Sequence, residues 1–161
     1  MKRRHLPALL VALVLAASAN GQPVEPTGPQ PELPKEKLAI VTRDGKAHIF
    51  NIEMALTPEQ QQVGEMFRTS VPVDGGMLFD WGQPQVSRMW MKNTLVSLDM
   101  VFIDPDGVIR TIAENTVPLS LATVDSRGPV RATLEVLGGT TAKLNIRVGD
   151  TVRQRIFENA P

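Results

Sequence analysis

The stretch MWMKNTLVSLDMVFID, residues 89–104, carries the strongest information about the fold. Most of it is apolar and rich in the residue types of a buried β-strand. Lys92, Asn93 and Thr94 interrupt the apolar run, and Asp99 stands among residues that belong in a core. The stretch therefore predicts a buried strand with a polar interruption, which is either a structural device or part of a small polar site.

Asp99 is the most informative residue of this stretch. Side chains alternate between the two faces of a strand, so in a strand over 96–104 Asp99 shares a face with Val101 and Ile103. Both faces are largely apolar, which indicates a strand whose outer face is also covered. A buried carboxylate is costly unless it is paired or hydrogen-bonded. We expect Arg68 or Lys92 as its partner, or backbone amides that it holds in place.

Local signals predict a hairpin and a helix near the start of the domain. Asp44-Gly45-Lys46 separates two β-prone runs, 37–43 and 47–55, and Asp-Gly favours a tight hairpin turn. Thr57 and Gln60 then stand in the positions of a capping box, with proline at the first helical position. The helix is predicted to run to about residue 67.

The rest of the chain predicts short strands. They cover 76–81, 85–91, 96–104, 108–114, 130–137 and 151–157, with a short helix or irregular crossing at 140–146. No strand–helix–strand alternation is present, so a doubly wound parallel sheet is not expected. The predicted fold class is mainly β: a compact antiparallel β-sandwich or barrel with one early helix packed on it.

The N-terminal residues predict a signal peptide over 1–19 and a spacer over 20–34. Basic residues at 2–4, an apolar run to Ala17 and small residues at 17–19 are typical of a cleaved leader. The apolar run is shorter than the roughly 20 residues that span a bilayer, which disfavours a membrane anchor and a stable membrane span. The proline-rich spacer is predicted to be disordered, followed by a single domain over 35–161. We expect an exported protein, periplasmic or secreted.

Composition excludes several classes of function. The 17 basic and 17 acidic residues leave a net charge near −3 once residues 2–4 are removed, which argues against nucleic-acid binding. The chain has no cysteine, and His48 is the one histidine outside the leader, predicted to lie at the surface. Zinc sites of the usual kind and histidine-dependent triads are therefore excluded, and no cofactor is expected. The segment 104–107 is interpreted as a turn rather than a calcium loop.

A polar set is distributed over the apolar strands. The candidate ligand-binding residues are Arg68, Trp90, Lys92, Asn93, Thr94, Asp99 and Glu135. A non-enzymatic domain would use them to bind a small ligand or glycan beside Trp90. Alternatively, they hold the fold of a structural or adaptor module that presents a surface to an envelope protein. A third possibility is a glycan hydrolase that uses Asp99 and Glu135 as its two carboxylates.

Six segments carry a resemblance to a known family. They are GEMFR (64–68), GGMLFDW (75–81), MWMKNTLVSLDMVFID (89–104), GVIRTI (107–112), LEVLGG (134–139) and GD (149–150). In this order they resemble the Domain of Unknown Function 192 family, whose small bacterial and archaeal members are often exported. The resemblance covers about residues 38–157. It implies a compact β-sandwich or barrel with a packed helix, and it brings no catalytic residues.

This chain departs from the family pattern at two positions. Glu65 replaces the leucine of Gly-Leu-Met, and Ser97 replaces a proline before Leu-Asp. We expect both changes to be tolerated at a turn or helix edge and to leave the polar set intact.

Overall fold

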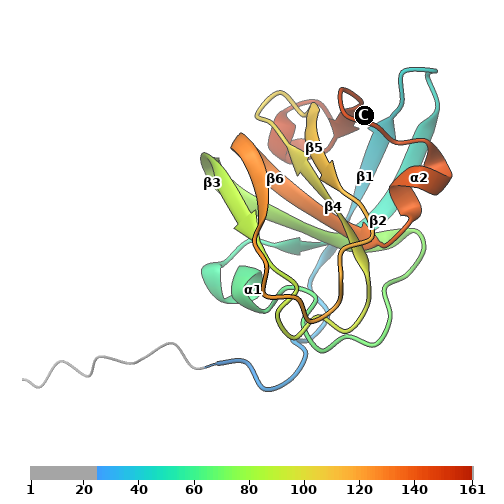
Figure 1. Ribbon diagram of the computed structural model, residues 1–161. Coiled ribbons are helices and arrows are strands. Elements are labelled where there is room, and N and C mark those ends of the chain that lie inside the picture. The colour runs from blue at the N-terminus through green and yellow to red at the C-terminus, as the bar shows by residue number, and fades with distance from the viewer. Residues whose placement is uncertain (1–24, 161) are drawn as a thin grey trace, which may run out of the picture.

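The computed structural model describes residues 25–160, and one seven-stranded sheet dominates it (Figure 1). The predicted signal peptide and the start of the spacer lie outside these residues. The strands are β1 Lys35–Val41, β2 Ala47–Ala55, β3 Gly75–Met89, β4 Leu98–Ile103, β5 Ile109–Ala113, β6 Val124–Leu137 and β7 Thr151–Arg153. Two short helices, α1 Pro58–Val63 and α2 Thr140–Leu144, and a 3₁₀ turn, η1 Arg155–Phe157, complete the fold.

The sheet curls until its two edges meet. Its strand order is β5-β4-β6-β3-β2-β1-β7, and one bridge, between Val108 and Thr151, links the two edge regions. Backbone hydrogen bonds from Ile109 N to Asp150 O and from Val152 N to Gly107 O flank that bridge. The predicted β-rich fold class is confirmed. One pair, β2 with β3, is parallel, because α1 and the following loop carry the chain from one to the other.

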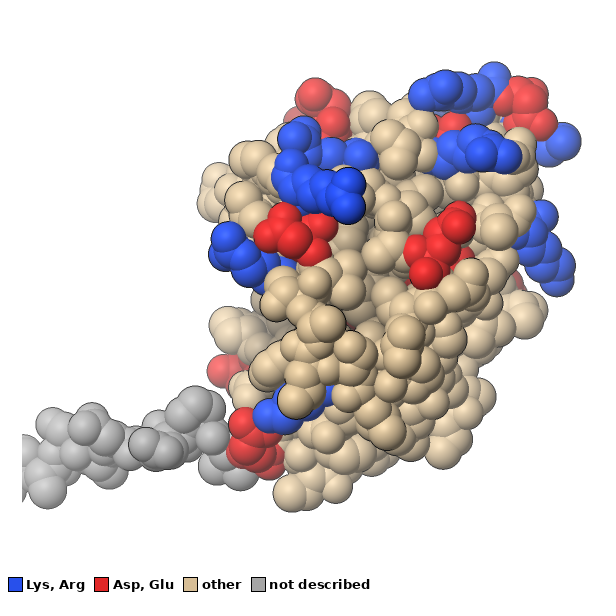
Figure 2. Space-filling model, viewed as in Figure 1, with Lys and Arg blue, Asp and Glu red and all other residues tan. Residues whose placement is uncertain are grey.

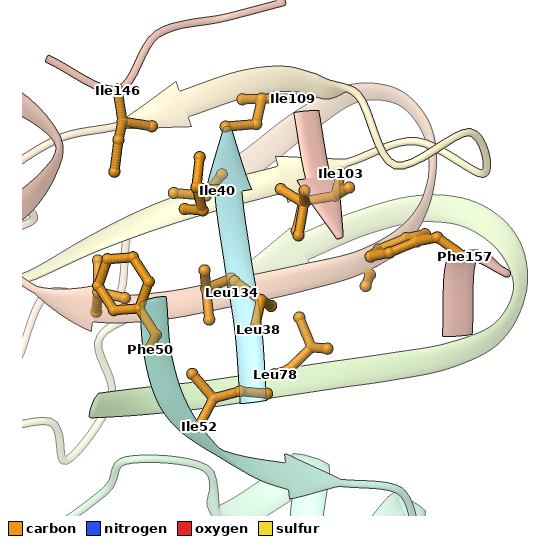
Figure 3. Packing of buried hydrophobic residues seen from close by; sticks show 14 of the residues in the cluster. Leu38, Ile40, Phe50, Ile52, Leu78, Ile103, Ile109, Leu134, Ile146 and Phe157 are labelled. Carbon is orange, nitrogen blue, oxygen red and sulfur yellow. The ribbon is translucent and has the colours of Figure 1, made fainter. Parts of the chain in front are cut away.

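The interior of the curled sheet is an apolar core. Figure 3 shows side chains from all sides of the sheet filling this space. Phe50, Leu78, Leu134 and Val136 are at most 2% exposed. Burial of this kind contributes roughly 25 cal/mol per Å² of apolar surface removed from water.

The outer face of the sheet is covered as well. Met100 and Phe102 point away from the interior and pack with Val71 and Met91 from the loops. Met77 and Phe79 form a second outer cluster. The prediction that both faces of the strand around Asp99 are buried is therefore confirmed.

The local signals near the start of the domain give the predicted elements. β1 and β2 pair as an antiparallel hairpin, and Thr57 and Gln60 form the capping box of α1. The helix, however, ends at Val63 rather than near residue 67. Gly64 has a φ of 50°, and a Cβ there would lie 2.9 Å from the ring of Phe79. The close approach of helix and sheet therefore stops the helix at this glycine.

Strand boundaries differ from the prediction where a bulge or a turn intervenes. The runs 76–81 and 85–91 are one strand, β3, with a register shift between Asp80 and Gln85. β6 begins at Val124, six positions before the predicted start. The last predicted strand, 151–157, is the short β7 followed by the turn η1.

The last residues of the predicted spacer belong to the fold. The side-chain amide of Gln30 donates to the carbonyl groups of Gln60 and Gly64, and Leu33 N donates to a carboxylate oxygen of Glu53. Polar groups of the domain hold this segment in place, so proline content alone did not locate the start of the fold.

Candidate functional site

A cleft of about 170 Å³ lies on the outer face of the sheet, where several predicted site residues meet. α1 and the residues after it form one wall, and β3 forms the other. The cleft is lined by Gln61, Gln62, Val63, Gly64, Glu65, Met66, Phe79, Trp81, Arg88, Met89, Trp90, Thr94 and Glu135. We call it the acidic cleft, because Glu65 and Glu135 supply its two carboxyl groups.

Glu135 belongs to β6, opposite Met77 of β3 and Met100 of β4. Its exposed fraction is 4%, and no hydrogen bond from residues 25–160 reaches its carboxyl group. Burial, and then the charge of Glu65, raises the pKa of Glu135 well above its ordinary value. Glu135 is thus a buried acid without a donor.

Glu65 enters the cleft directly after the end of α1. It is 3% exposed, and its Oε2 atom has no hydrogen-bond partner within the described chain. The guanidinium of Arg68 lies 3.3 Å away and lowers the pKa of Glu65. Burial raises the pKa of Glu65 by more than Arg68 lowers it, and repulsion from Glu53 raises it further. The pKa of Glu65 is therefore about 7.

Arg68 is committed mainly to Glu53 of β2. Its two terminal nitrogens lie 2.6 and 2.8 Å from the two carboxylate oxygens, a bidentate pair. Burial alone would raise the pKa of Glu53, but the hydrogen bonds from Arg68 and Leu33 hold it below its ordinary value. Arg68 therefore forms a bidentate ion pair with Glu53 and a longer ion pair with Glu65. Among residues 25–160, no cation pairs with Glu135.

Aromatic rings form the upper part of the cleft. Phe79 and Trp81 stack with ring centroids 5.8 Å apart, and Trp90 is 49% exposed at the rim. The Lys92 ammonium lies 5.1 Å from the Trp90 ring centroid and 2.6 Å from a carboxylate oxygen of Glu25. The exposed indole thus already accepts a cation on its surface.

Asn93 and Thr94 form the turn that ends this strand region. Asn93 adopts a φ of 55°, which asparagine tolerates better than most residues. Thr94 N donates to Met91 O, and Phe67 N donates to Asn93 O. The turn therefore fixes the residues after α1 against the rim of the cleft.

Asp99 lies on the opposite face of the sheet from Glu135. In the β4–β6 register Asp99 is opposite Val136 and Met100 is opposite Glu135, so the two acids point to different sides. Of the two expected environments of Asp99, the ion pair with Arg68 or Lys92 is wrong, and the carboxylate that holds backbone amides is confirmed. The carboxylate of Asp99 accepts backbone N–H groups of Asn115, Gly139 and Thr141 at 2.8–3.0 Å and the Thr141 hydroxyl at 2.7 Å.

A model of the DUF192 family, described as uncharacterized ACR, matches residues 39–154. The chain belongs to the DUF192 family. The resemblance inferred from its sequence segments is therefore confirmed, and with it the expected fold. No curated protein matches the chain.

Two solved structures share the fold. A proposed transcription regulator from Sinorhizobium meliloti 1021 is 42% identical, with a TM-score of 0.77 over 79% of this chain and 98% of that one. A protein of unknown function from Novosphingobium aromaticivorans DSM 12444 is 33% identical, with a TM-score of 0.74 over 89% of this chain and 100% of that one.

The structure brings three of the seven predicted site residues, Trp90, Thr94 and Glu135, into the acidic cleft. Arg68, Lys92 and Asn93 contact residues that line it, and Asp99 lies outside. The structure also adds Glu53 and Glu65, which the sequence analysis missed. Glu53 stands between Ile52 and Met54, the same pattern that drew attention to Glu135. Glu65 is the departure from the DUF192 pattern that we expected a helix edge to tolerate. The structure buries it as the second acid of the cleft.

Proposed function

We propose that this DUF192 domain is an exported, non-enzymatic binding protein whose acidic cleft takes a positively charged amino group of a small ligand or glycan unit. One observation carries the proposal: two buried carboxyl groups lie in an aromatic-walled cleft without the donors that buried acids require. A bound ammonium group would supply both charge and hydrogen-bond donors.

The charges around the cleft favour a cation. Glu53 and Glu65 share one arginine, Arg68. The raised pKa of Glu135 favours its neutral form, and a bound ammonium group would favour ionisation of this third carboxyl group. The other nearby cations are engaged elsewhere, since Arg88 pairs with Asp125 and Lys92 with Glu25. An anionic ligand would add repulsion to this set, whereas a cation removes it.

The walls favour an amine over a metal ion. Calcium and magnesium take six or more oxygen ligands, and the cleft offers two carboxyl groups beside aromatic rings and methionines. Among residues 25–160, no group of three His, Cys, Asp or Glu side chains could hold a metal. Aromatic faces instead attract ammonium groups by cation–π interaction.

A hydrolase using Asp99 and Glu135 is not supported, because the two side chains lie on opposite faces of the sheet. Paired catalytic carboxyls must flank one bond. Trp90 is 49% exposed at the rim, which supports a binding role over a purely structural one, because a side chain that only holds the fold would be buried.

Export remains part of the proposal and rests on the sequence of residues 1–19. Within residues 25–160, no helix combines the length and the apolar character needed to cross a bilayer. The Sinorhizobium meliloti relative is described as a proposed transcription regulator. A DNA-binding role for this chain is not favoured, since basic and acidic side chains are interspersed on the face shown in Figure 2. Expression in a bacterial host, fractionation and N-terminal sequencing would test export, and a mature chain beginning at Asn20 is the expected result.

Tryptophan fluorescence gives a direct test of ligand binding. The chain has two tryptophans and no tyrosine, and both Trp81 and Trp90 line the cleft. We expect saturable quenching or enhancement with glucosamine at about pH 7, where its amine is still mostly charged, and a much weaker response to N-acetylglucosamine, which has no amine charge. Affinity for glucosamine should rise from about pH 5.5 to about pH 7 as Glu65 begins to ionise, and fall at higher pH as the sugar loses its charge.

Variants sharpen this test. Glu65→Leu restores the residue of the DUF192 pattern, and Glu135→Gln keeps the shape of the side chain. Each should weaken glucosamine binding about tenfold or more, a change of about 1.4 kcal/mol. Glu158→Gln, at an exposed acid far from the cleft, is the matched control and should not change it. An equal fluorescence response to glucosamine and N-acetylglucosamine would refute a site that selects by charge. Equal affinity of the three variants for glucosamine would refute it as well.

A further inference from the structure

A second and larger cavity, of about 470 Å³, lies at one end of the curled sheet beside α2. In Figure 1, α2 and α1 lie on different sides of the sheet, so this cavity is separate from the acidic cleft. Its lining comes from the start of β2, the loop before β3, the end of β6 and α2. These residues are Ala47, His48, Ile49, Phe50, Val73, Asp74, Leu137, Gly138, Gly139, Thr140, Lys143 and Leu144.

The walls of this cavity are apolar and partly open to solvent. Ile49 and Val73 are 54% and 70% exposed, so their aliphatic side chains are accessible to a ligand from solvent. Phe50 closes the inner side, where it belongs to the interior core (Figure 3). A cavity of this size, with apolar walls and a few polar groups, has the character of a small-molecule site.

Three polar side chains stand in these walls without partners. His48 is partly exposed, but its Nε2 atom is buried and has no hydrogen bond within residues 25–160. Asp74 and Lys143 are exposed, and neither takes part in an ion pair in the described part of the chain. The cavity therefore presents one acid, one base and one unpaired imidazole around an apolar surface.

Asp99 gives this cavity a fixed wall. Two of its backbone contacts, to Gly139 N and Thr141 N, hold the chain where it enters α2. The end of the segment LEVLGG, residues 137–139, thus lies at the cavity and is held there by Asp99, whereas Glu135 of the same segment lines the acidic cleft. A buried carboxylate that holds loop backbone in place is what a preformed site needs.

We propose that this cavity binds a free amino acid with an apolar side chain. The side chain would contact Ile49, Phe50 and Leu144, while the carboxylate faces Lys143 and the ammonium group faces Asp74. A zwitterion matches the one positive and one negative group without an excess of either. A purely aliphatic ligand would leave both of them without a partner.

Histidine NMR tests the proposal at the site itself. His48 is the one histidine in the chain from Asn20 onward, so its imidazole signals are assigned without ambiguity. We expect phenylalanine to shift these signals saturably. Phenethylamine, without the carboxylate, and 3-phenylpropanoate, without the amine, should each bind several-fold more weakly.

Charge variants complete the test. Lys143→Ala and Asp74→Asn should each weaken phenylalanine binding about threefold to fivefold, the size expected for a solvent-exposed ion pair. Lys37→Ala and Asp106→Asn make the same charge changes at exposed positions elsewhere and should have no effect. Absence of a saturable His48 shift would overturn the proposal. So would equal affinity for all three ligands, or equal behaviour of the site and control variants.

Discussion

Asp99 and Glu135 lie on neighbouring strands, one position out of register, and both are almost completely buried. Their surroundings differ completely. Asp99 accepts three backbone N–H groups and one hydroxyl, whereas Glu135 accepts no hydrogen bond from the described chain. The interior side of the sheet ends in loops whose amides turn toward Asp99. The outer side offers Glu135 methionines, aromatic rings and a second acid.

The difference shows that depth of burial does not decide the role of an acid. A carboxylate with several donors is a structural tether, since removing it leaves those donors unsatisfied. A carboxyl group without donors contributes nothing comparable to the fold. It is therefore the better candidate for binding something from outside. Substitutions on the two sides of the sheet should separate these roles.

The largest expected effect is at Asp99. Asp99→Asn replaces one acceptor with a donor that faces N–H groups, and Asp99→Ala leaves the three backbone N–H groups without their acceptor, while the Thr141 hydroxyl can still donate to Glu114. Each should lower the free energy of unfolding by about 3 kcal/mol or more, measured by denaturant titration. Glu135→Gln, by contrast, should not destabilise the protein at pH 7. Equal losses of unfolding free energy in the Asp99 and Glu135 variants would contradict the assignment of a structural role to Asp99 and a binding role to Glu135.

Arg68 should come second. Arg68→Ala leaves Glu53 buried without its bidentate partner and removes the cation that, among residues 25–160, pairs with Glu65. We expect a loss of about 2–4 kcal/mol in unfolding free energy at pH 7. The double variant with Glu53→Gln should recover part of that loss, and a double-mutant cycle would measure the coupling. Fully additive losses would mean that the pair contributes little.

The pH dependence of the unfolding free energy should reveal the raised pKa values of the two carboxyl groups in the acidic cleft. Burial raises the pKa of Glu65 to about 7, above its unfolded value, so the folded state binds the proton more tightly. The resulting stability is complete below about pH 4.5 and is lost as pH rises through about 7, with a slope of up to about 1.4 kcal/mol per pH unit. Carboxyl groups with a lowered pKa, such as Glu53, change the stability of the fold in the opposite direction and at lower pH: their contribution is lost as pH falls below about 4.5.

Thermal or denaturant unfolding at pH 5 and pH 7.5 checks this expectation. The wild-type chain should lose about 2 kcal/mol between these two conditions. Glu65→Leu should reduce the loss, and the double variant with Glu135→Gln should abolish it. A wild-type profile that is flat or rises with pH would contradict the raised pKa values of the cleft.

The smallest effect on stability is expected at Trp90. Its ring is half exposed, so Trp90→Ala should change the unfolding free energy by less than about 1 kcal/mol. The same variant should weaken glucosamine binding several-fold, measured calorimetrically because one of the two fluorescent reporters is lost. A large loss of stability would instead assign Trp90 to the core.

Local chemistry made some of this structure predictable. The Asp-Gly turn and the capping box of α1 depend on neighbouring residues alone, and both are present as predicted. The early end of α1 depends on a close approach between Gly64 and Phe79, fifteen positions apart, which no local pattern reveals. The parallel pairing of β2 with β3 likewise depends on how the whole sheet closes.

In the candidate site, too, the sequence predicted what depends on neighbouring residues and missed what depends on distant contacts. An acid between apolar neighbours was a sound signal for burial at Asp99 and Glu135, and it applies equally to Glu53. It could not say which donors each acid would meet. The donors to Asp99 are mostly backbone N–H groups, which every residue carries, so they leave no trace in the sequence.

The closure of the sheet has a consequence for how the chain folds. The first strand pairs with the last, and Arg43 N donates to Asp150 Oδ1 across 107 positions of sequence. The cost of closing such a long loop must be met before these contacts stabilise anything, which slows folding. The β1–β2 hairpin can form early, but the barrel can close only after the C-terminal strand has emerged. A chain of this topology remains open during synthesis, the state in which a polypeptide can still be threaded across a membrane.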